Sequence, residues 1–582
     1  MTTDEKIDSI ISDATARLMA MRRQDGMWEG HLSSSAISTA VSVFALSVID
    51  RKEYSREIHR GTQWLLQTIK PCGAWGDSVE SPVNMTATLL SYVALHHLRH
   101  VPEATERYVR ETLGWKDETL LVDGVLSYYG RDLTFSVPIL MMCALAGIVS
   151  NWRRIPPFPF ELAVLPQSTF RFLNLPVVSY AIPALIAVGI LQNRRRKSWI
   201  SPMREWLVPK ALKVLATLQP EDGGFLEAAP LTAFVSMCMA EAGLKEHAVT
   251  KRCARFLRAT QREDGAWPID TNLAGWVTSL ASRAIGDMMS DVERRQLATT
   301  ICGNATKERH PFTGAPAGGW GWTNLSGSVP DGDDTSGALV ALHTLLNGEY
   351  VPEVGAGIDW LISLQNRDGG MPTFCRGWGK LPFDRSTPDI TAHALLAMSL
   401  WADALPHDRQ PSCRKSISRM KAWLQKAMTS EGAWNPLWFG DQDATDEKNP
   451  VYGSATIIDY LFSIPTSPLT LDSSPRWRHS GGKRAELARA LHPGFLLSCQ
   501  NDDGGWGGNR GVASKVTLTA KVIGALRHFR PATDEAIRRG IDFLYAHYEA
   551  GTLYRREPIG LYFSRLWYSE DLYTPVYLLM AL

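Results

Sequence analysis

Several long segments of this chain repeat apolar residues every three to four positions, which is the spacing of one face of an α-helix. Clear examples run from Ser336 to Leu346 and from Asp389 to Ala402. Stretches that alternate strictly between apolar and polar residues, with hairpin signals at their ends, are scarce. The pattern therefore predicts an all-α protein built from helical hairpins.

A degenerate repeat separates these segments: aromatic-Leu, three residues, Gln, two residues, Asp-Gly, one residue and a second aromatic. The clearest copies are Phe256–Trp267 and Phe495–Trp506. In each copy the first aromatic and Leu end a helix, Gln bonds backbone groups at the helix end, and Asp-Gly supplies the turn. We expect repeat tryptophans such as Trp267 and Trp506 to pack in the core. Other copies occupy residues 24–28, 67–75, 219–225, 360–370 and 425–434.

The repeats are interrupted by a stretch without them, between residues 120 and 210. At 582 residues the chain is also too long for one ordinary compact core. We therefore expect two α-barrels. One is an inserted domain near residues 21–255, and the other comprises residues 256–582 together with residues 1–20.

The longest apolar run covers residues 176–192 and is interrupted by Pro183, which makes it short for a membrane-spanning helix. A basic cluster, Arg194–Lys197, follows it directly. Two interpretations stay open. The run dips into one leaflet of a membrane with its cations at the anionic lipid surface, or it is a buried core helix with a solvated basic end. The residues before the run that favour the membrane are Phe170, Phe172 and Leu173.

Composition excludes several classes of protein. Apolar residues make up 45% and charged residues 21%, as in a globular protein, and the net charge of +1 gives no reason to expect nucleic acid. The eight cysteines contain no CxxC pair, which argues against structural zinc or a disulfide framework and suits a reducing compartment. The polar N-terminus has no secretory signal. We expect a cytoplasmic protein that associates with the inner face of the membrane.

The run Asp331-Gly332-Asp333-Asp334-Thr335 places three carboxylates within four residues, just after the aromatic and glycine-rich stretch Gly318–Trp322. Carboxylates crowded away from water raise one another's pKa, so one of them can stay protonated near neutral pH. The chain is also rich in tryptophan, with 20 residues. A neutral acid beside aromatic rings suits a reaction that protonates an apolar molecule and then shelters a cation.

Together the repeats and the acidic run resemble the class II terpene cyclases, most closely the squalene–hopene cyclases, over nearly the whole chain. The repeat is similar to that family's QW motif, and Asp331–Asp334 is similar to its DxDD motif. The resemblance implies two α/α-barrels of the βγ type. It also implies an intramolecular isomerase that protonates a linear isoprenoid, such as squalene, to give a polycyclic terpene. No cofactor is implied, apart from magnesium if the substrate is a diphosphate.

The resemblance also implies roles for single residues. Asp333 would protonate a terminal alkene, and Asp331 and Asp334 would hold hydrogen bonds around it. His393 would bond the acid, while Asp389 lies four residues earlier on the same helical face and would hold the imidazole. No metal ligand is implied. The implied cavity aromatics are Trp276, Trp322, Phe374, Trp434, Trp438, Tyr452, Tyr562, Phe563, Trp567 and Tyr568.

Two segments depart from the family pattern. Squalene–hopene cyclases carry glutamates at the far end of the cavity, in the segments that match Ser33–Val43 and Ala87–Ala94, where this chain has no carboxylate. The stretch between residues 365 and 389 is shorter than in the family. The substrate therefore stays open: squalene or a similar triterpene precursor leads, and a prenyl diphosphate or prenylated aromatic is the alternative, with Lys380 holding the polar head. The basic residues of the shorter stretch are Arg376, Lys380 and Arg385.

Other functions fit less well. The protein prenyltransferase β subunit needs an Asp-x-Cys zinc pair, and no cysteine here has Asp two residues before it. Barrel glycosidases use separated carboxylates. A scaffold protein would need Asp331 only as a helix cap, and an EF-hand would need Glu where Leu342 stands. The expected partners are an apolar isoprenoid, the membrane surface and a second copy in a homodimer, with no nucleic acid.

Overall fold

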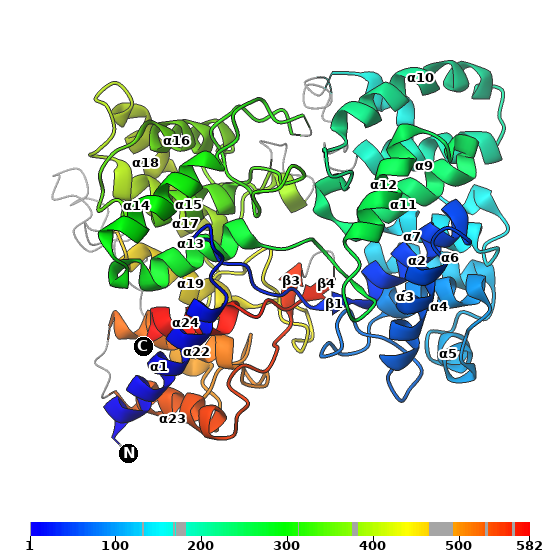
Figure 1. Cartoon of the computed structure of the whole chain (residues 1–582). Coiled ribbons are helices and arrows are strands. Elements are labelled where there is room, and N and C mark those ends of the chain that lie inside the picture. The colour runs from blue at the N-terminus through cyan, green and yellow to red at the C-terminus, as the bar shows by residue number, and fades with distance from the viewer. Residues whose placement is uncertain are drawn as a thin grey trace.

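Helices make up most of the computed structural model, and its strands are short. In Figure 1 the helices gather in two lobes that lie side by side, with β1 and β3–β4 drawn between them. The prediction of an all-α fold is confirmed. The structure describes residues 2–130, 133–166, 169, 182–311, 313–374, 382–464, 493–529, 534–561 and 565–582. Residues singled out above that lie outside this description are Phe170, Phe172, Leu173, Arg376, Lys380, Tyr562 and Phe563.

The first barrel lies in the right-hand lobe of Figure 1. Its described helices are α2 (Ala36–Asp50), α3 (Ser55–Gln67), α4 (Met85–Leu98), α5 (Glu103–Arg107), α6 (Glu118–Tyr129), α7 (Leu133–Leu145), α9 (Ile182–Arg195), α10 (Ser201–Leu218), α11 (Ala229–Met239) and α12 (Ala248–Ala259). Helices α2, α4, α7, α9 and α11 each contact the next, and α11 contacts α2, so they form a closed inner ring. Helices α3, α6, α10 and α12 each pack against a member of that ring.

The second barrel has a matching inner ring. Its described helices are α1 (Thr3–Ala20), α13 (Ala274–Ile285), α14 (Asp291–Gly303), α15 (Gly332–Leu345), α16 (Pro352–Leu364), α17 (Pro388–Trp401), α18 (Gln410–Ala427), α19 (Pro450–Phe462), α21 (Gly494–Ser498), α22 (Val516–Arg527), α23 (Glu535–Glu549) and α24 (Tyr573–Ala581). Helices α13, α15, α17, α19, α22 and α24 contact one another in that order, and α24 closes the ring on α13. Helix α1 packs on α23 and α24, so the N-terminus lies on the second barrel (Figure 1).

The described residues form two large hydrophobic cores, one in each barrel. Met27 and Trp28 pack in the core of the second barrel. Buried apolar side chains of residues 256–267, which the sequence pattern assigns to the second barrel, pack instead in the core of the first. The reason is local, because the indole N–H of Trp267 donates to the carbonyl of Leu257 at 2.7 Å and keeps this turn attached to α12.

Short strands connect the two barrels. Strand β1 (Ser34–Ser35) pairs antiparallel with β2 (Trp267–Pro268). The chain passes from the second barrel to the first at β1 and returns to the second barrel after β2. Strands β3 (Ile559–Leu561) and β4 (Leu566–Tyr568) form a second antiparallel pair. In Figure 1 this pair lies at the side of the second barrel that faces the first.

The sequence repeat makes the same hydrogen bonds at successive positions. Its glutamine also ties neighbouring units together, because the Gln261 amide donates to Gly265 O at 2.9 Å and to Glu57 O at 2.9 Å. Gly265 has φ +93°, a left-handed conformation that favours glycine. In five copies the indole N–H of the closing tryptophan donates to the carbonyl ten residues earlier, in the pairs Trp28–Leu18, Trp75–Leu65, Trp267–Leu257, Trp434–Leu424 and Trp506–Leu496.

The longest apolar run is a buried helix in the part that the structure describes. All residues of α9 from Ile182 to Asn193 are buried. The basic residues that follow are ion-paired: Arg194 lies 2.5 Å from Glu205, and Arg195 lies 2.7 Å from Glu241. For this part of the run the core-helix interpretation therefore holds. Within the described ranges, every helix is too short or too polar to cross a bilayer.

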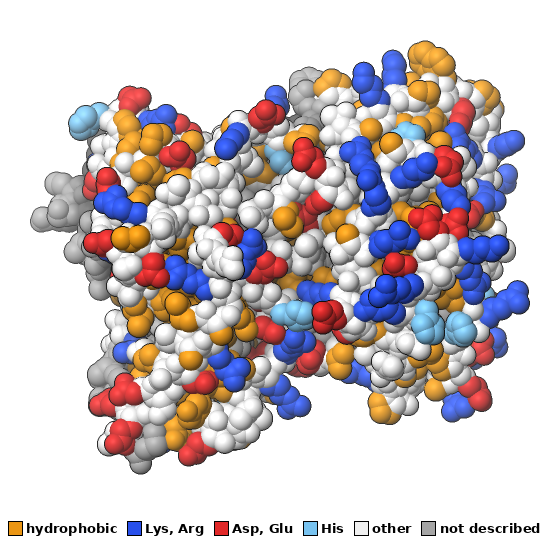
Figure 2. Space-filling view, in the orientation of Figure 1, with side chains coloured by type: hydrophobic (Ala, Val, Ile, Leu, Met, Phe, Trp, Pro, Cys, Tyr) orange, Lys and Arg blue, Asp and Glu red, His pale blue; other side chains and the backbone are white. Residues whose placement is uncertain are grey.

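A different segment of the first barrel exposes apolar side chains. Trp199, Met203 and Trp206, at the N-terminal end of α10, have exposed fractions of 92%, 62% and 71%. Met203 and Trp206 are three residues apart and share one face of α10, and Trp199 lies in the turn just before the helix. Figure 2 shows exposed hydrophobic side chains at the end of the molecule where α10 lies, with Lys and Arg side chains beside them. We call these three residues the α10 stripe.

Candidate active site

The acidic run begins helix α15, and Asp331 is its N-cap. The Asp331 Oδ1 accepts hydrogen bonds from the backbone N–H of Asp333 at 2.7 Å and of Asp334 at 2.8 Å. A carboxylate at this position satisfies N–H groups that have no partner within the helix. Asp331 and Asp334 are buried, whereas the side chain of Asp333 keeps an exposed fraction of 20%. The cap therefore fixes the backbone that presents Asp333.

Burial raises the pKa of two carboxyl groups of this cluster, Asp331 and Asp334. Desolvation raises the pKa of Asp331 to about 6, although hydrogen bonds from Asp334 and Asp333 oppose the shift. Desolvation, followed by the charge of Asp331, raises the pKa of Asp334 well above its usual range. Among the described residues Asp334 Oδ1 has no hydrogen-bond partner. Burial and the neighbouring charge of Asp331 therefore favour the protonated form of Asp334.

His393 on α17 reaches Asp333 on the neighbouring helix α15. Its Nδ1 lies 2.7 Å from Asp333 Oδ1. The ring is buried, stacks on Tyr460 with centroids 4.5 Å apart, and meets the edge of Trp276 at 6.0 Å. Packing on both sides fixes the orientation of the imidazole. An N–H donated to Asp333 stabilises the carboxylate that remains after proton transfer, which strengthens the acid.

The i, i+4 spacing predicts that Asp389 holds the imidazole of His393, and this prediction is wrong. Its carboxylate accepts a hydrogen bond from the Thr387 hydroxyl and one from the Leu437 N–H at 3.3 Å. In the described part of the chain no hydrogen bond joins Asp389 to His393. The physical reason is that Asp389 lies in the first turn of α17, where an Asp side chain bonds neighbouring groups at the helix start. Burial raises the pKa of Asp389 to about 6, and the charge of Asp333 adds to the shift.

A cavity of about 310 Å³ lies between the barrels and reaches the acidic cluster. This volume is within the range of small-molecule sites. Apolar side chains from both barrels line it: Ile37, Leu90, Pro138 and Phe234 come from the first, and Leu273, Trp276 and Trp322 from the second. The charged groups among its described lining residues are all aspartates, namely Asp270, Asp331, Asp333 and Asp334. The site is thus an apolar chamber with a buried acid at its wall.

Five of the predicted aromatic residues line this cavity: Trp276, Trp322, Phe374, Trp438 and Tyr568. Phe374 meets Trp322 edge-on at 6.2 Å and Trp438 edge-on at 5.9 Å. The Trp438 indole N–H donates to the Thr373 hydroxyl at 3.0 Å, which fixes that ring. Aromatic faces attract cations. The wall next to the acid can therefore stabilise a carbocation.

Three other predicted aromatics are not among the described lining residues. Trp434 is fully buried, and its indole serves the repeat by donating to Leu424 O at 3.0 Å. The Tyr452 hydroxyl lies 3.5 Å from that of Tyr577, behind the cavity wall. Trp567 is buried in strand β4. Position along the chain could not reveal which face of an element meets the cavity.

The structure also adds lining residues that the sequence pattern missed. Phe383 packs on Phe374 at 5.3 Å and on Trp438 at 5.4 Å, within the stretch that is shorter than in the related family. Asp270 lies three residues after the repeat tryptophan Trp267. A charged residue directly after the apolar residues Trp267–Ile269 could have identified it from the sequence. Other missed aromatic lining residues are Tyr129, Phe135, Phe234, Phe439 and Tyr573.

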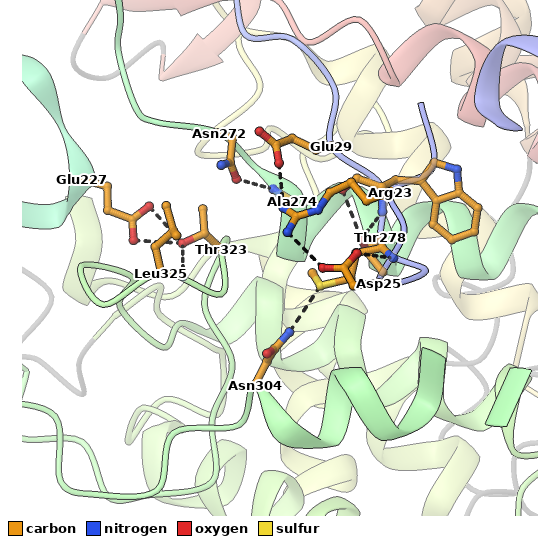
Figure 3. Close-up of polar contacts among 12 residues, drawn as sticks. Arg23, Asp25, Glu29, Glu227, Asn272, Ala274, Thr278, Asn304, Thr323 and Leu325 are labelled. Carbon is orange, nitrogen blue, oxygen red and sulfur yellow. Dashed lines mark hydrogen bonds and ion pairs between the residues drawn. The ribbon is translucent and has the colours of Figure 1, made fainter. Parts of the chain in front are cut away.

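The loop between β2 and α13 is held on both of its sides. Asn272 Oδ1 accepts the Ala274 N–H at 2.9 Å, as Figure 3 shows. The Thr271 hydroxyl donates to the carbonyl of Glu227 at 3.3 Å, and the Glu227 carboxylate accepts from the Thr323 hydroxyl at 2.9 Å (Figure 3). These bonds join the loop to the first barrel and to the segment before α15, so the loop has a fixed place in the cavity wall.

Two family models match the chain. The squalene–hopene cyclase N-terminal domain matches residues 11–108, and the squalene–hopene cyclase C-terminal domain matches residues 303–582. Together these segments make up more than half of the chain. The second one contains the acidic run, His393 and most of the aromatic wall.

Individual proteins agree with this match. The chain is 24% identical to enfumafungin synthase of Hormonema carpetanum over 90% of its own length, but it spans only 44% of that relative. It is 22% identical to a probable squalene–hopene cyclase of Sinorhizobium fredii, covering 92% of this chain and 90% of the relative. The structure of ent-copalyl diphosphate synthase from Streptomyces platensis matches with a TM-score of 0.53 at 17% identity, over 98% of this chain and 99% of that one. The last likeness shows the fold.

Proposed function

Because the chain belongs to the squalene–hopene cyclase family of class II terpene cyclases, we propose that it cyclises a linear, uncharged isoprenoid such as squalene by protonating a terminal double bond. One observation supports this best: the Asp333 carboxyl, 2.7 Å from His393, borders an aromatic cavity between two barrels. A simple alkene is a very poor base, so its acid must be neutral, shielded from water and held in place.

The proposed chemistry starts at Asp333. Its O–H proton moves to the terminal alkene carbon, the π electrons form the new C–H bond, and a tertiary cation remains on the neighbouring carbon. Successive double bonds then attack the cation, and each attack forms one C–C bond. The Asp333 carboxylate left behind keeps its hydrogen bond to His393. The faces of Trp276 and Trp322 would each stabilise a nearby cation by roughly 0.5–2 kcal/mol.

The cavity wall supports an uncharged substrate. The described lining contains four aspartates and no lysine or arginine, so it offers nothing to neutralise a diphosphate. The alternative, a prenyl diphosphate or a prenylated aromatic, rests on Arg376 and Lys380, which lie outside the described residues. A diphosphate substrate would call for magnesium, whereas protonation of an uncharged polyene requires no cofactor.

We further propose that the α10 stripe touches a membrane, from which an apolar substrate would come. Tryptophan favours the interface between lipid and water, and cations favour anionic head groups. Lys210 lies over the ring of Trp206 at 5.4 Å, and the basic cluster that ends α9 precedes Trp199. The contact surface would thus be the start of α10, not the buried helix α9.

Turnover in heavy water tests the proposed function. The purified chain is incubated in D₂O with squalene, with geranylgeraniol and with geranylgeranyl diphosphate plus magnesium, and the products are analysed by mass spectrometry. Cyclic isomers of squalene are expected that carry one added deuterium on a ring carbon, namely the former CH carbon of the protonated double bond. Conversion of the diphosphate alone would favour the alternative substrate, and conversion of none of the three would overturn the proposal.

A further inference from the structure

Asp270 is a carboxyl group in the cavity that the initiation step does not use. It lies in the loop between β2 and α13 and lines the same cavity as Asp333. Among the described residues no hydrogen bond or ion pair reaches its carboxylate. The neighbouring side chains of the loop do have partners, since Thr271 bonds Glu227. Asn272 bonds Ala274, as Figure 3 shows. The backbone at Asp270 is therefore fixed, while its carboxylate is left to the cavity.

Such a group is costly in a folded protein. Asp270 is partly buried, and a carboxylate that loses part of its water without gaining a partner destabilises the fold, so its ionisation shifts instead. Burial alone raises the pKa of Asp270 to about 7. A group with that pKa exchanges its proton near neutral pH, which is the property of an effective general base. Because the protein supplies no partner in its described part, the partner is expected to be the cavity's occupant.

We propose, on the basis of the proposed cyclase function, that Asp270 is the base that ends the cyclisation. Its carboxylate takes a proton from the carbon next to the final cationic centre. The electrons of that C–H bond become the C=C bond of the product, and Asp270 becomes neutral. After product release Asp270 gives its proton to water and Asp333 regains one from water, so the cycle is balanced.

The lining leaves few other groups for this step. Among the described lining residues, the polar groups besides the aspartates are hydroxyls of Thr86, Tyr129, Thr134, Thr373, Tyr568 and Tyr573, which are far weaker bases than a carboxylate. Asp331 and Asp334 belong to the acid cluster that starts the reaction. The segments Ser33–Val43 and Ala87–Ala94 contain no carboxylate. Asp270 is thus the described carboxylate that is both in the cavity and outside the acid cluster.

A product analysis of Asp270→Asn and Asp270→Glu tests this inference, with whichever of the three probes above the unaltered chain converts. Asn keeps the shape of Asp but cannot take the proton, whereas Glu keeps a base. In Asp270→Asn we expect substrate consumption to continue, while the share of the normal alkene product falls by about tenfold or more and alcohols or shifted alkenes replace it. Asp270→Glu should retain more of the normal product. Asp287→Asn, an exposed aspartate on the second barrel, is the matched control.

Each outcome has a distinct meaning. An unchanged product mixture in Asp270→Asn would overturn the role of Asp270 and leave the proposed function standing. Complete loss of consumption in folded Asp270→Asn would also overturn it, because a terminating base acts after initiation. If the unaltered chain converts none of the probes, the proposed function fails and this inference fails with it. Thermal melting monitors folding, and Asp270→Asn should melt no lower than the unaltered chain, since the native carboxylate has no partner to lose among the residues that the structure describes.

Discussion

At the scale of single residues, the site depends on how a buried imidazole meets a partly exposed carboxyl. Asp333 and His393 lie 60 positions apart in the sequence, yet their polar atoms are 2.7 Å apart because α15 and α17 are neighbours in the inner ring. Asp331 holds the first turn of α15, and burial raises the pKa of Asp334 beside it well above its usual range. The three carboxyl groups therefore differ in their proposed roles. Asp333 is the proton donor, Asp331 caps the helix, and Asp334 lies buried beside them.

Asp333→Asn tests the acid itself. The amide has the shape of the carboxyl but no acidic proton, so turnover should fall by at least about 10²–10⁴-fold, the usual range for a proton donor. The amide oxygen can still accept a hydrogen bond from His393, and the melting temperature should change little. Product formation and thermal melting would be measured on the same preparation. Turnover close to that of the unaltered chain would exclude Asp333 as the acid.

His393→Ala tests the positioning role of the imidazole. Without its hydrogen bond the Asp333 carboxylate is less stable, so we expect turnover to fall by about 10²-fold with little change in KM. His393→Asn places an amide N–H near the former Nδ1 and should recover part of the loss. Initial rates of the three proteins would be compared at several substrate concentrations. Equal losses in the Ala and Asn variants would point to packing alone.

At the scale of elements, each repeat joins a helix end to its turn. The indole N–H of the closing tryptophan satisfies a carbonyl at the end of the preceding helix, and the glutamine amide bonds the turn. The sequence predicts these positions well, because both of these partners lie within ten residues in the chain. It does not show which other aromatics face the cavity. Trp434 belongs to this structural set, although the family resemblance implied a cavity role for it.

Trp506→Phe separates the two kinds of tryptophan. The change removes the N–H that donates to Leu496 O at 2.7 Å, while this carbonyl keeps the Cys499 N–H at 3.1 Å, so the free energy of unfolding should fall by about 0.5–1.5 kcal/mol, the usual net value of one hydrogen bond. Turnover at a temperature well below melting should stay within about twofold, because Trp506 is remote from the acid. Trp322→Phe is the matched variant in the cavity wall, where turnover should fall more than stability. Urea unfolding and product formation would be measured for both variants.

At the scale of the whole molecule, the cavity exists only because the two barrels meet. Asp77, in the first barrel, accepts the backbone N–H of Trp567 in strand β4 at 2.7 Å and the Asn84 amide at 2.7 Å. This strand pair contributes Leu561 and Leu566 to the cavity lining. The buried carboxyl of Asp77 is thus one link between the two barrels beside the site. Burial raises its pKa to about 7, despite these two hydrogen bonds.

The ionisation of Asp77 predicts a dependence of stability on pH. Its pKa in the folded chain lies above the unfolded value, so its contribution is complete below about pH 4 and is lost as the pH rises through about 7. Asp77→Asn does not titrate. The free energy of unfolding of the unaltered chain minus that of Asp77→Asn should therefore fall between pH 5 and pH 7, by up to about 1.4 kcal/mol per pH unit. Urea unfolding at pH 5, 6, 7 and 8 measures this difference, and a constant value would contradict the prediction.

The α10 stripe predicts how the whole molecule meets lipid. Replacing Trp199 and Trp206 together by Ser should reduce co-sedimentation with vesicles of phosphatidylglycerol and phosphatidylcholine by at least about tenfold, because each indole loses its place at the interface. Met288→Ser removes a side chain with an exposed fraction of 69% on the second barrel and is the matched control. Equal binding by the double variant and the control would exclude the stripe as the contact surface.

The sequence by itself determined the helical class, the repeat and the acidic run with its histidine, because periodicity, turns and helix caps depend on residues close together in the chain. Only the tertiary structure decided that α9 is buried, that Asp389 bonds Thr387 and Leu437 and not His393, and that Asp270 and Phe383 line the cavity. These facts depend on which faces of distant helices pack against each other. The cavity is formed by both barrels together, so a one-dimensional pattern could identify its acid but not its walls.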